Sequence, residues 1–132
     1  MLDTTAFSAA MRNEAEMVTF LQELRPGEIA TVPPVAAEIE YGIRRIDPET
    51  KKYSLLIAQK TKLLSVIRIL PWDSEASQNF GIIKAALERA GTPLDDFDIA
   101  IGAIALSHNA EVITANLTHF SRIHGLVSRH WH

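Results

Sequence analysis

Three carboxylates and one amide occupy positions where a folded chain could bring them together. Asp3 ends the short apolar segment at the start of the sequence, and Glu38 lies in the helix predicted to follow the second strand. Asp98 opens an apolar helix, and Asn116 follows the fourth predicted strand. Because an open α/β sheet forms its site at the carboxyl ends of its strands, the sequence predicts that these four side chains converge on one point.

The chemistry of such a cluster is that of hard oxygen ligands, since the chain contains no cysteine. Oxygen ligands suit Mg²⁺ or Mn²⁺ and are poor for zinc or copper. Several like charges pressed together also raise one another's pKa, so the carboxylates themselves need a cation. A bound ion of this class polarises a phosphoryl oxygen, lowers the pKa of a bound water and stabilises the leaving oxygen. The chemistry predicted is hydrolysis of a phosphodiester.

Each acid also has an ordinary structural interpretation. Asp3 could cap the first helix, and Glu38 could occupy one solvated helix position. The acids Asp95, Asp96 and Asp98 could supply an N-cap and two charges favoured by the helix dipole. Asp98 is less easily explained in this way, because a carboxylate that precedes an apolar run on a buried helix needs a partner or a metal. Both interpretations stay open at this point.

Short strands alternate with helices along the chain. Strands are predicted over 1–3, 29–32, 67–70, 111–114 and 126–128. Helices are predicted over 6–11, 14–24, 34–45, 49–66, 73–90 and 97–108, with a further helical turn around 117–123. The segment 99–106 is apolar nearly all round, which predicts a helix buried in the middle of the domain. The alternation predicts an α/β fold with a parallel sheet covered on both faces.

The composition is typical of one compact domain, over residues 1–132. Of the 132 residues, 47% are hydrophobic and 22% charged, and no repeat or linker-like tract interrupts them. The lack of cysteine excludes a disulfide scaffold, a thiolate zinc site and an iron–sulfur cluster. No secretion signal is visible, and the longest apolar stretch is too short to span a bilayer. We therefore expect a soluble cytoplasmic protein with no membrane partner.

Short motifs follow one another in order along nearly the whole chain. They are Met-Leu-Asp-Thr-Thr at 1–5, Glu-Ile-Glu-Tyr-Gly-Ile at 38–43, Leu-Pro-Trp-Asp at 70–73, Phe-Gly at 80–81, the apolar run at 98–106, Ile-Thr-Ala-Asn-Leu-Thr-His-Phe at 113–120 and Gly-Leu at 125–126. In order and spacing the sequence resembles the PIN-domain ribonucleases, and within them the VapC toxins of bacterial VapBC toxin–antitoxin pairs. The resemblance implies a PIN-like three-layer α/β/α fold with a short-stranded central parallel sheet and a projecting helical pair.

Carried over residue by residue, the resemblance assigns catalytic and metal-binding roles to the acids. The family's first acid falls on Asp3, the acid of its Glu-x-x-x-Gly motif on Glu38, and its third acid on Asp98. Its fourth position, often Asp, falls on Asn116, which brings no charge and is a weaker contributor. Glu40 competes with Glu38 but points roughly 200° away around a helix. We therefore expect the three carboxylates to hold Mg²⁺ or Mn²⁺, with no nucleotide cofactor.

Other positions depart from the family's pattern. Thr5 stands where relatives often have Asn and keeps a hydrogen-bonding group, and Gly102 stands where they commonly have Ala. Asp95 stands where they often have Gly. It lies three residues before Asp98, on the same face if one helix includes both, and could supplement the charge that Asn116 lacks.

Basic residues cluster although the net charge of −3 opposes nucleic-acid binding by bulk charge. Seven of the thirteen lie in one stretch: Arg44, Arg45, Lys51, Lys52, Lys60, Lys62 and Arg68. In a VapC-like fold four of these would lie beside the catalytic groove and could hold RNA phosphates: Arg44, Arg45, Lys51 and Lys52. The two arginines could instead pair with Glu40, Asp47 or Glu49. For Lys60 and Lys62 we prefer a solvated helix face.

The resemblance also implies protein partners. It implies a homodimer, within a larger toxin–antitoxin assembly, and a small VapB-like antitoxin whose C-terminal segment lies in the groove and covers the acids. Candidates for that contact on the two predicted arm helices are Tyr41, Leu55, Leu56 and Leu63.

Two other groups of residues invite a functional interpretation that we do not adopt. All five histidines lie at or after His108, but no pair has the spacing of a zinc site on a helix, and 130–132 form a terminus expected to be poorly ordered. Trp72 and Phe80 are expected in the core, because base-stacking aromatics are exposed.

The sequence thus predicts a Mg²⁺- or Mn²⁺-dependent endoribonuclease of a toxin–antitoxin pair. Water would attack the RNA phosphodiester in line and leave a 5′-phosphate and a 3′-hydroxyl. One alternative is a non-catalytic PIN-like module that keeps only protein binding, because Asn116 has lowered its metal affinity. Another is a solitary RNA-processing nuclease. Fold alone does not separate these functions.

Overall fold

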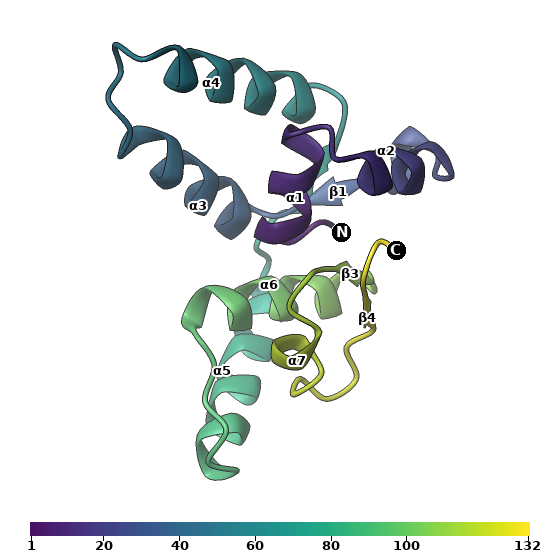
Figure 1. The fold of residues 1–132 in the computed structure, drawn as a ribbon. Helices are drawn as coiled ribbons and strands as arrows, with labels where there is room; N and C mark the ends of the chain where they lie inside the picture. Colours follow the sequence, from purple (N-terminus) through teal and green to yellow (C-terminus); the bar gives the residue numbers. More distant parts are fainter.

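The computed structural model describes every residue from Met1 to His132. The helices are α1 (Thr4–Met11), α2 (Ala15–Gln22), α3 (Pro33–Arg44), α4 (Lys51–Leu64), α5 (Ser74–Arg89), α6 (Asp96–Ser107) and α7 (Leu117–Phe120), with a 3-10 turn η1 at Pro26–Glu28. The strands are β1 (Ala30–Thr31), β2 (Arg68–Ile69), β3 (Val112–Ile113) and β4 (Ser128–Arg129). Figure 1 shows their arrangement.

The strands form two parallel pairs, β1 with β2 and β3 with β4. The first residues of the chain join the pairs. The N–H of Leu2 donates to the carbonyl of Ala30 at 2.8 Å, and Leu2 also forms a parallel bridge with Ile113. The strand predicted at 1–3 is therefore reduced to this bridge. Asp3 leaves it next to Thr114, which follows β3, so both residues lie at the carboxyl ends of neighbouring strands.

Helices α3 and α4 extend together away from α5, α6 and α7 (Figure 1). The predicted break at 47–48 separates them, and the Thr50 hydroxyl caps α4 by accepting the N–H of Tyr53 at 3.2 Å. Glu40 of α3 accepts hydrogen bonds from Arg44 on the same helix and from Lys60 on α4. This charged contact ties the two helices of the projecting pair to each other.

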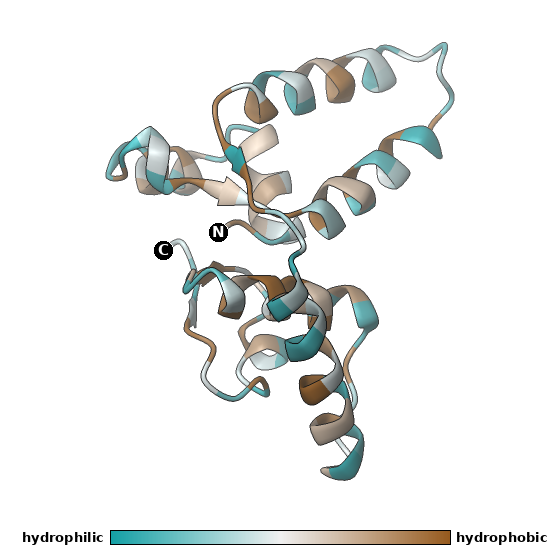
Figure 2. Cartoon of the chain, turned by 180° about the vertical axis from the view of Figure 1, so that it is seen from behind, coloured by the Kyte–Doolittle hydropathy of each residue, from teal (hydrophilic) through white to brown (hydrophobic).

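The core surrounds α6, whose middle turns are buried on every side, as its continuous apolar sequence predicts. Phe7, Met17 and Phe120 are among the largest fully buried side chains of the core. Gly102 faces Ile123 so closely that a Cβ there would lie 2.6 Å from Cδ1 of Ile123. In Figure 2 hydrophilic residues mark the far end of the α3–α4 pair, away from this core.

The helices begin and end close to the predicted positions. Asp73 caps α5 as expected, with its carboxylate accepting the N–H of Ala76 at 2.7 Å. Helix α3 begins at Pro33 rather than at residue 34, and α4 ends at Leu64, two residues before its predicted end. Strand β4 lies at the end of its predicted range and extends one residue beyond it. None of the helices combines the length and the apolar character needed to cross a membrane.

Of two expectations about aromatic residues, the one for Trp72 was wrong, and the one for Phe80 holds in part because its side chain packs against the core. Trp72 is 43% exposed rather than in the core, and Phe80 is only partly buried beside it. Trp72 lies in the irregular segment before α5, where no periodicity marks a buried face, whereas Phe80 lies within α5 itself. The C-terminus, expected to be poorly ordered, is anchored because Trp131 is buried and its Nε1 donates to Glu14 at 3.3 Å.

Candidate active site

Asp3 is held by three donors at the carboxyl end of the Leu2 bridge. Its Oδ1 accepts the N–H of Ala6 at 2.9 Å and the hydroxyl of Thr5 at 2.7 Å, and its Oδ2 accepts the hydroxyl of Thr114 at 2.6 Å. Only 2% of Asp3 is exposed. Asp3 therefore caps α1 and is also the buried acid of the acidic site. The Thr5 hydroxyl also makes a second hydrogen bond, in which its oxygen accepts the N–H of Ala115 at 2.9 Å.

Glu38 faces Asp3 from the second turn of α3, where its Oε1 accepts the hydroxyl of Thr4 at 2.7 Å. Burial raises the pKa of Glu38, the hydrogen bond from Thr4 opposes that rise, and the charges of Asp98, Asp95 and Asp3 add to it. These acids are thus close enough for their charges to act on Glu38.

Glu40 points the other way, as the helical period predicts. Hydrogen bonds from Lys60 and then Arg44 lower its pKa. Glu40 therefore belongs to the contact between α3 and α4, and Glu38 belongs to the acidic site.

Asp98 enters the site from the first turn of α6, with 20% of its side chain exposed. Burial raises its pKa, contact with His119 opposes the rise, and the charges of Asp95 and Asp3 increase it. The Nδ1 atom of His119 lies 2.9 Å from Oδ2 of Asp98. The spacing of the histidines in the sequence does not indicate this contact. The available signal was position, since His119 lies three residues after Asn116 on the same turn.

Asp95 and Asn116 lie at the edges of the site. Asp95 caps α6, since its Oδ1 accepts the N–H of Phe97 at 2.8 Å, and its charge still reaches Glu38 and Asp98. Asn116 precedes α7, and its N–H donates to the Thr114 hydroxyl at 2.8 Å. Its side chain makes no capping bond.

The acids from three segments are therefore neighbours, but they do not form a closed cage. No three Asp, Glu or His side chains lie close enough together to surround one cation as they stand. The donor chemistry, three carboxylates with one amide beside them, suits a hard divalent cation.

The PIN domain family matches residues 1–126. The chain belongs to the PIN-domain family. The tRNA(fMet)-specific endonuclease VapC of Salmonella typhimurium is 29% identical over 132 residues, which cover 99% of this chain and 96% of that protein. Ribonuclease VapC2 of Rickettsia felis is 26% identical over 133 residues, with the same two coverages of 99% and 96%.

Solved structures confirm the PIN-like fold. VapBC2 from Rickettsia felis, bound to a DNA fragment from its promoter, superposes with a TM-score of 0.88 at 25% identity, covering 100% of this chain and 98% of that chain. VapBC-1 from nontypeable Haemophilus influenzae gives a TM-score of 0.85 at 26% identity, covering 99% and 96%. The similarity to VapC inferred from the motifs is likewise confirmed.

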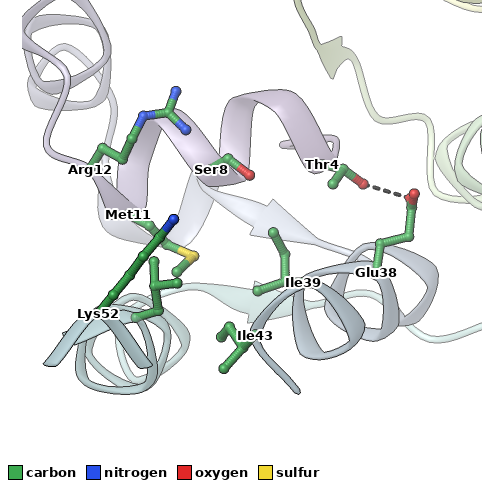
Figure 3. Close-up of a pocket in the computed structure, with 10 residues that line it drawn as sticks. Thr4, Ser8, Met11, Arg12, Glu38, Ile39, Ile43 and Lys52 are labelled. Carbon is green, nitrogen blue, oxygen red and sulfur yellow. Dashed lines mark hydrogen bonds between the residues drawn. The ribbon is translucent and has the colours of Figure 1, made fainter. Parts of the chain in front are cut away.

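A groove of about 420 Å³ runs from Glu38 along this PIN domain, between α1, α3 and α4. Apolar side chains from all three helices line it: Met11, Ile39, Ile43 and Leu56. Figure 3 shows Thr4 and Glu38 at one end and Arg12 and Lys52 at the other. The groove therefore joins an acidic end, next to the site, to a basic end through an apolar middle.

The four candidate RNA contacts differ in their surroundings. Arg44 is engaged within the projecting pair, with Glu40 at 2.7 Å and a hydrogen bond to Tyr53. Arg45 lies over the ring of Tyr41. Lys51 and Lys52 are exposed, and Lys52 lines the groove. Of the apolar antitoxin candidates, Tyr41 and Leu55 are exposed, whereas Leu56 and Leu63 are partly buried against the core.

Proposed function

We propose that this PIN domain is an endoribonuclease toxin that hydrolyses RNA phosphodiester bonds and is inhibited by a cognate antitoxin. The observation that carries the proposal is the meeting of Asp3, Glu38 and Asp98 from three separate segments, with burial and mutual charge raising the pKa of Glu38 and Asp98. The VapC names of its relatives support the same function. RNA turnover by such a toxin takes place in the cytoplasm.

We propose Asp3, Glu38 and Asp98 as ligands of Mg²⁺ or Mn²⁺, with Asn116 as a weaker contributor. A bound ion of this kind polarises the phosphoryl group and lowers the pKa of a coordinated water. The chain's own residues fix the ligands in place: Thr5 and Thr114 hold Asp3, and Thr4 holds Glu38. Asp95 contributes negative charge from its capping position.

Two groups of side chains fit the RNA and the antitoxin. Arg45, Lys51 and Lys52 are the exposed cations without a carboxylate partner that could hold RNA phosphates, whereas Arg44 is paired with Glu40. The groove fits a peptide segment of a VapB-like antitoxin, with apolar side chains in its middle and a cationic one toward Glu38. The structural neighbours that are VapBC complexes support such a partner.

A homodimer is proposed through an aromatic hollow on another face. Pro34, Trp72, Phe80 and Phe97 line it, and Trp72 and Phe97 are exposed. Large exposed aromatics gathered in one hollow are typical of protein interfaces. We expect replacement of Trp72 and Phe97 by Ser to yield monomers in light scattering. Ile82→Ser, at an exposed position on α5 outside this hollow, should leave the dimer intact.

The deciding experiment is cleavage of total cellular RNA by the purified protein with Mg²⁺ or Mn²⁺, with EDTA, and with the Asp98→Asn variant. Discrete fragments with 5′-phosphate ends, lost in EDTA and in the variant, would support the ribonuclease and identify its target by end-sequencing. No cleavage by folded, antitoxin-free protein in either metal would instead favour the non-catalytic binding module. The uncharged Asn116 and the open arrangement of the acids are the observations on its side.

A further inference from the structure

The imidazole of His119 contacts the acidic site from a segment that also braces Asp3. Nδ1 of His119 lies 2.9 Å from Oδ2 of Asp98. The next residue, Phe120, is fully buried, so the backbone that carries His119 is fixed in the core. The turn begins at Asn116, whose N–H donates to Thr114, and Thr114 donates to Asp3. One short segment therefore holds two of the three acids.

This contact divides the roles of the two Asp98 oxygens. Oδ2 is occupied by His119, whereas Oδ1 makes no hydrogen bond within the protein. The Nδ1 contact also fixes the ring, which leaves Nε2 directed away from the carboxylate. Mutating a residue that hydrogen-bonds to a metal-ligating carboxylate typically lowers metal affinity or activity 10- to 100-fold.

We propose that His119 is the positioning residue for Asp98, holding the carboxylate through Nδ1 so that Oδ1 is available to the cation. The inference rests on the proposed function, because it concerns the same metal site. It matters more in this chain than in one with four acids, since Asn116 adds no charge and affinity then depends on how well three carboxylates are oriented.

The test is Mn²⁺ binding, measured from the EPR signal of free Mn²⁺ in the absence of RNA. His119→Ala should weaken Mn²⁺ binding about 10- to 100-fold. His119→Asn should restore most of the affinity, because the Asn amide N–H₂ can donate from nearly the same place as Nδ1–H.

His108→Ala is the matched control. His108 also contacts a neighbouring loop, with Nε2 3.0 Å from the carbonyl of Pro71, but it lies at the opposite end of α6 from Asp98. Its removal should leave Mn²⁺ affinity unchanged. Thermal unfolding of all three variants, followed by circular dichroism, identifies any loss of affinity that comes from unfolding.

A direct bond from His119 to the metal is the competing interpretation, and pulsed EPR separates the two. Bound Mn²⁺ without ¹⁴N coupling is expected for a positioning residue, and strong ¹⁴N coupling that disappears in His119→Ala would overturn the proposal. Unchanged affinity in a folded His119→Ala variant, or equal losses in the Ala and Asn variants, would also overturn it and leave the ribonuclease proposal intact. If the wild-type chain binds no Mn²⁺, both the proposed metal site and the positioning role of His119 are overturned.

Discussion

Removing the hydroxyl of Thr114 tests whether its hydrogen bonds hold Asp3 in place. Thr114 is fully buried, donates to Oδ2 of Asp3 at 2.6 Å and accepts the N–H of Asn116 at 2.8 Å. Thr114→Val keeps the shape of the side chain and removes both bonds. A hydrogen bond to a charged group contributes about 1.5–3 kcal/mol, and an unsatisfied buried donor or acceptor costs about 1–3 kcal/mol. Asn116 is partly exposed, so water can replace its lost acceptor. We therefore expect a loss of about 2–4 kcal/mol in the free energy of unfolding.

Urea unfolding measures this loss directly. With a slope of about 2 kcal/mol per molar urea, the midpoint should fall by about 1–2 M. Thr114→Ser keeps the hydroxyl and loses only a methyl group, which costs about 1 kcal/mol. A valine variant that is no less stable than the serine variant would refute a stabilising role for the Thr114 hydroxyl. Thr5→Val should cost less than Thr114→Val, because Oδ1 of Asp3 keeps the N–H of Ala6 when Thr5 is lost.

Three further predictions concern the charges and the packing around the site. Because the pKa values of Glu38 and Asp98 are raised in the folded chain, the folded state binds more protons than the unfolded state. The contribution of these groups to stability therefore falls as pH rises from the ordinary carboxyl pKa through the raised values. The test compares the melting temperatures of the Asp98→Asn variant and the wild type in EDTA. The difference, variant minus wild type, should increase as pH rises over that range. A difference that does not change with pH would contradict the raised pKa of Asp98. Gly102→Ala places a Cβ 2.6 Å from Ile123 Cδ1, so overpacking of about 1–3 kcal/mol opposes a helix-propensity gain of about 1 kcal/mol. In an Ile123→Val background, which lacks Cδ1, the same Gly102→Ala change should stabilise the chain in thermal unfolding; equal effects in both backgrounds would exclude the clash. Glu40→Gln should speed amide hydrogen exchange in α4 relative to α5, because Lys60 loses its charged partner, and unchanged exchange would mean that the apolar contacts alone hold the pair.

Local patterns sufficed to predict most of the helices and to separate Glu38 from Glu40. Proline, glycine and capping residues mark where helices stop and start, so Asp73 was identified correctly as the cap of α5. The helical period separated Glu38 from Glu40, and their contacts with Thr4 and Lys60 confirm that separation. Both features depend on residues close together in the sequence, where backbone geometry alone decides the outcome.

Features that depend on docking between distant segments could not be predicted in this way. The contact of His119 with Asp98 depends on how α7 packs against α6, which periodicity does not specify. Trp131 reaches Glu14 across a sequence separation of 117 residues. Asp95 could be either a cap or an extra acid on the sequence alone, and its short bond to the N–H of Phe97 shows that it caps α6.

The three acids are not equivalent, and the difference bears on how the site would take up a cation. Asp3 is nearly inaccessible and accepts three hydrogen bonds, so its position is set by the fold itself. Glu38 and Asp98 each accept one side-chain hydrogen bond and carry raised pKa values. They are therefore the two groups whose negative charge gains most from a nearby cation. A carboxamide at position 3 should cost both stability and cation binding, because a buried amide cannot accept from all three donors as the carboxylate does. A carboxamide at Glu38 or Asp98 should abolish cation binding while relieving repulsion in the metal-free chain.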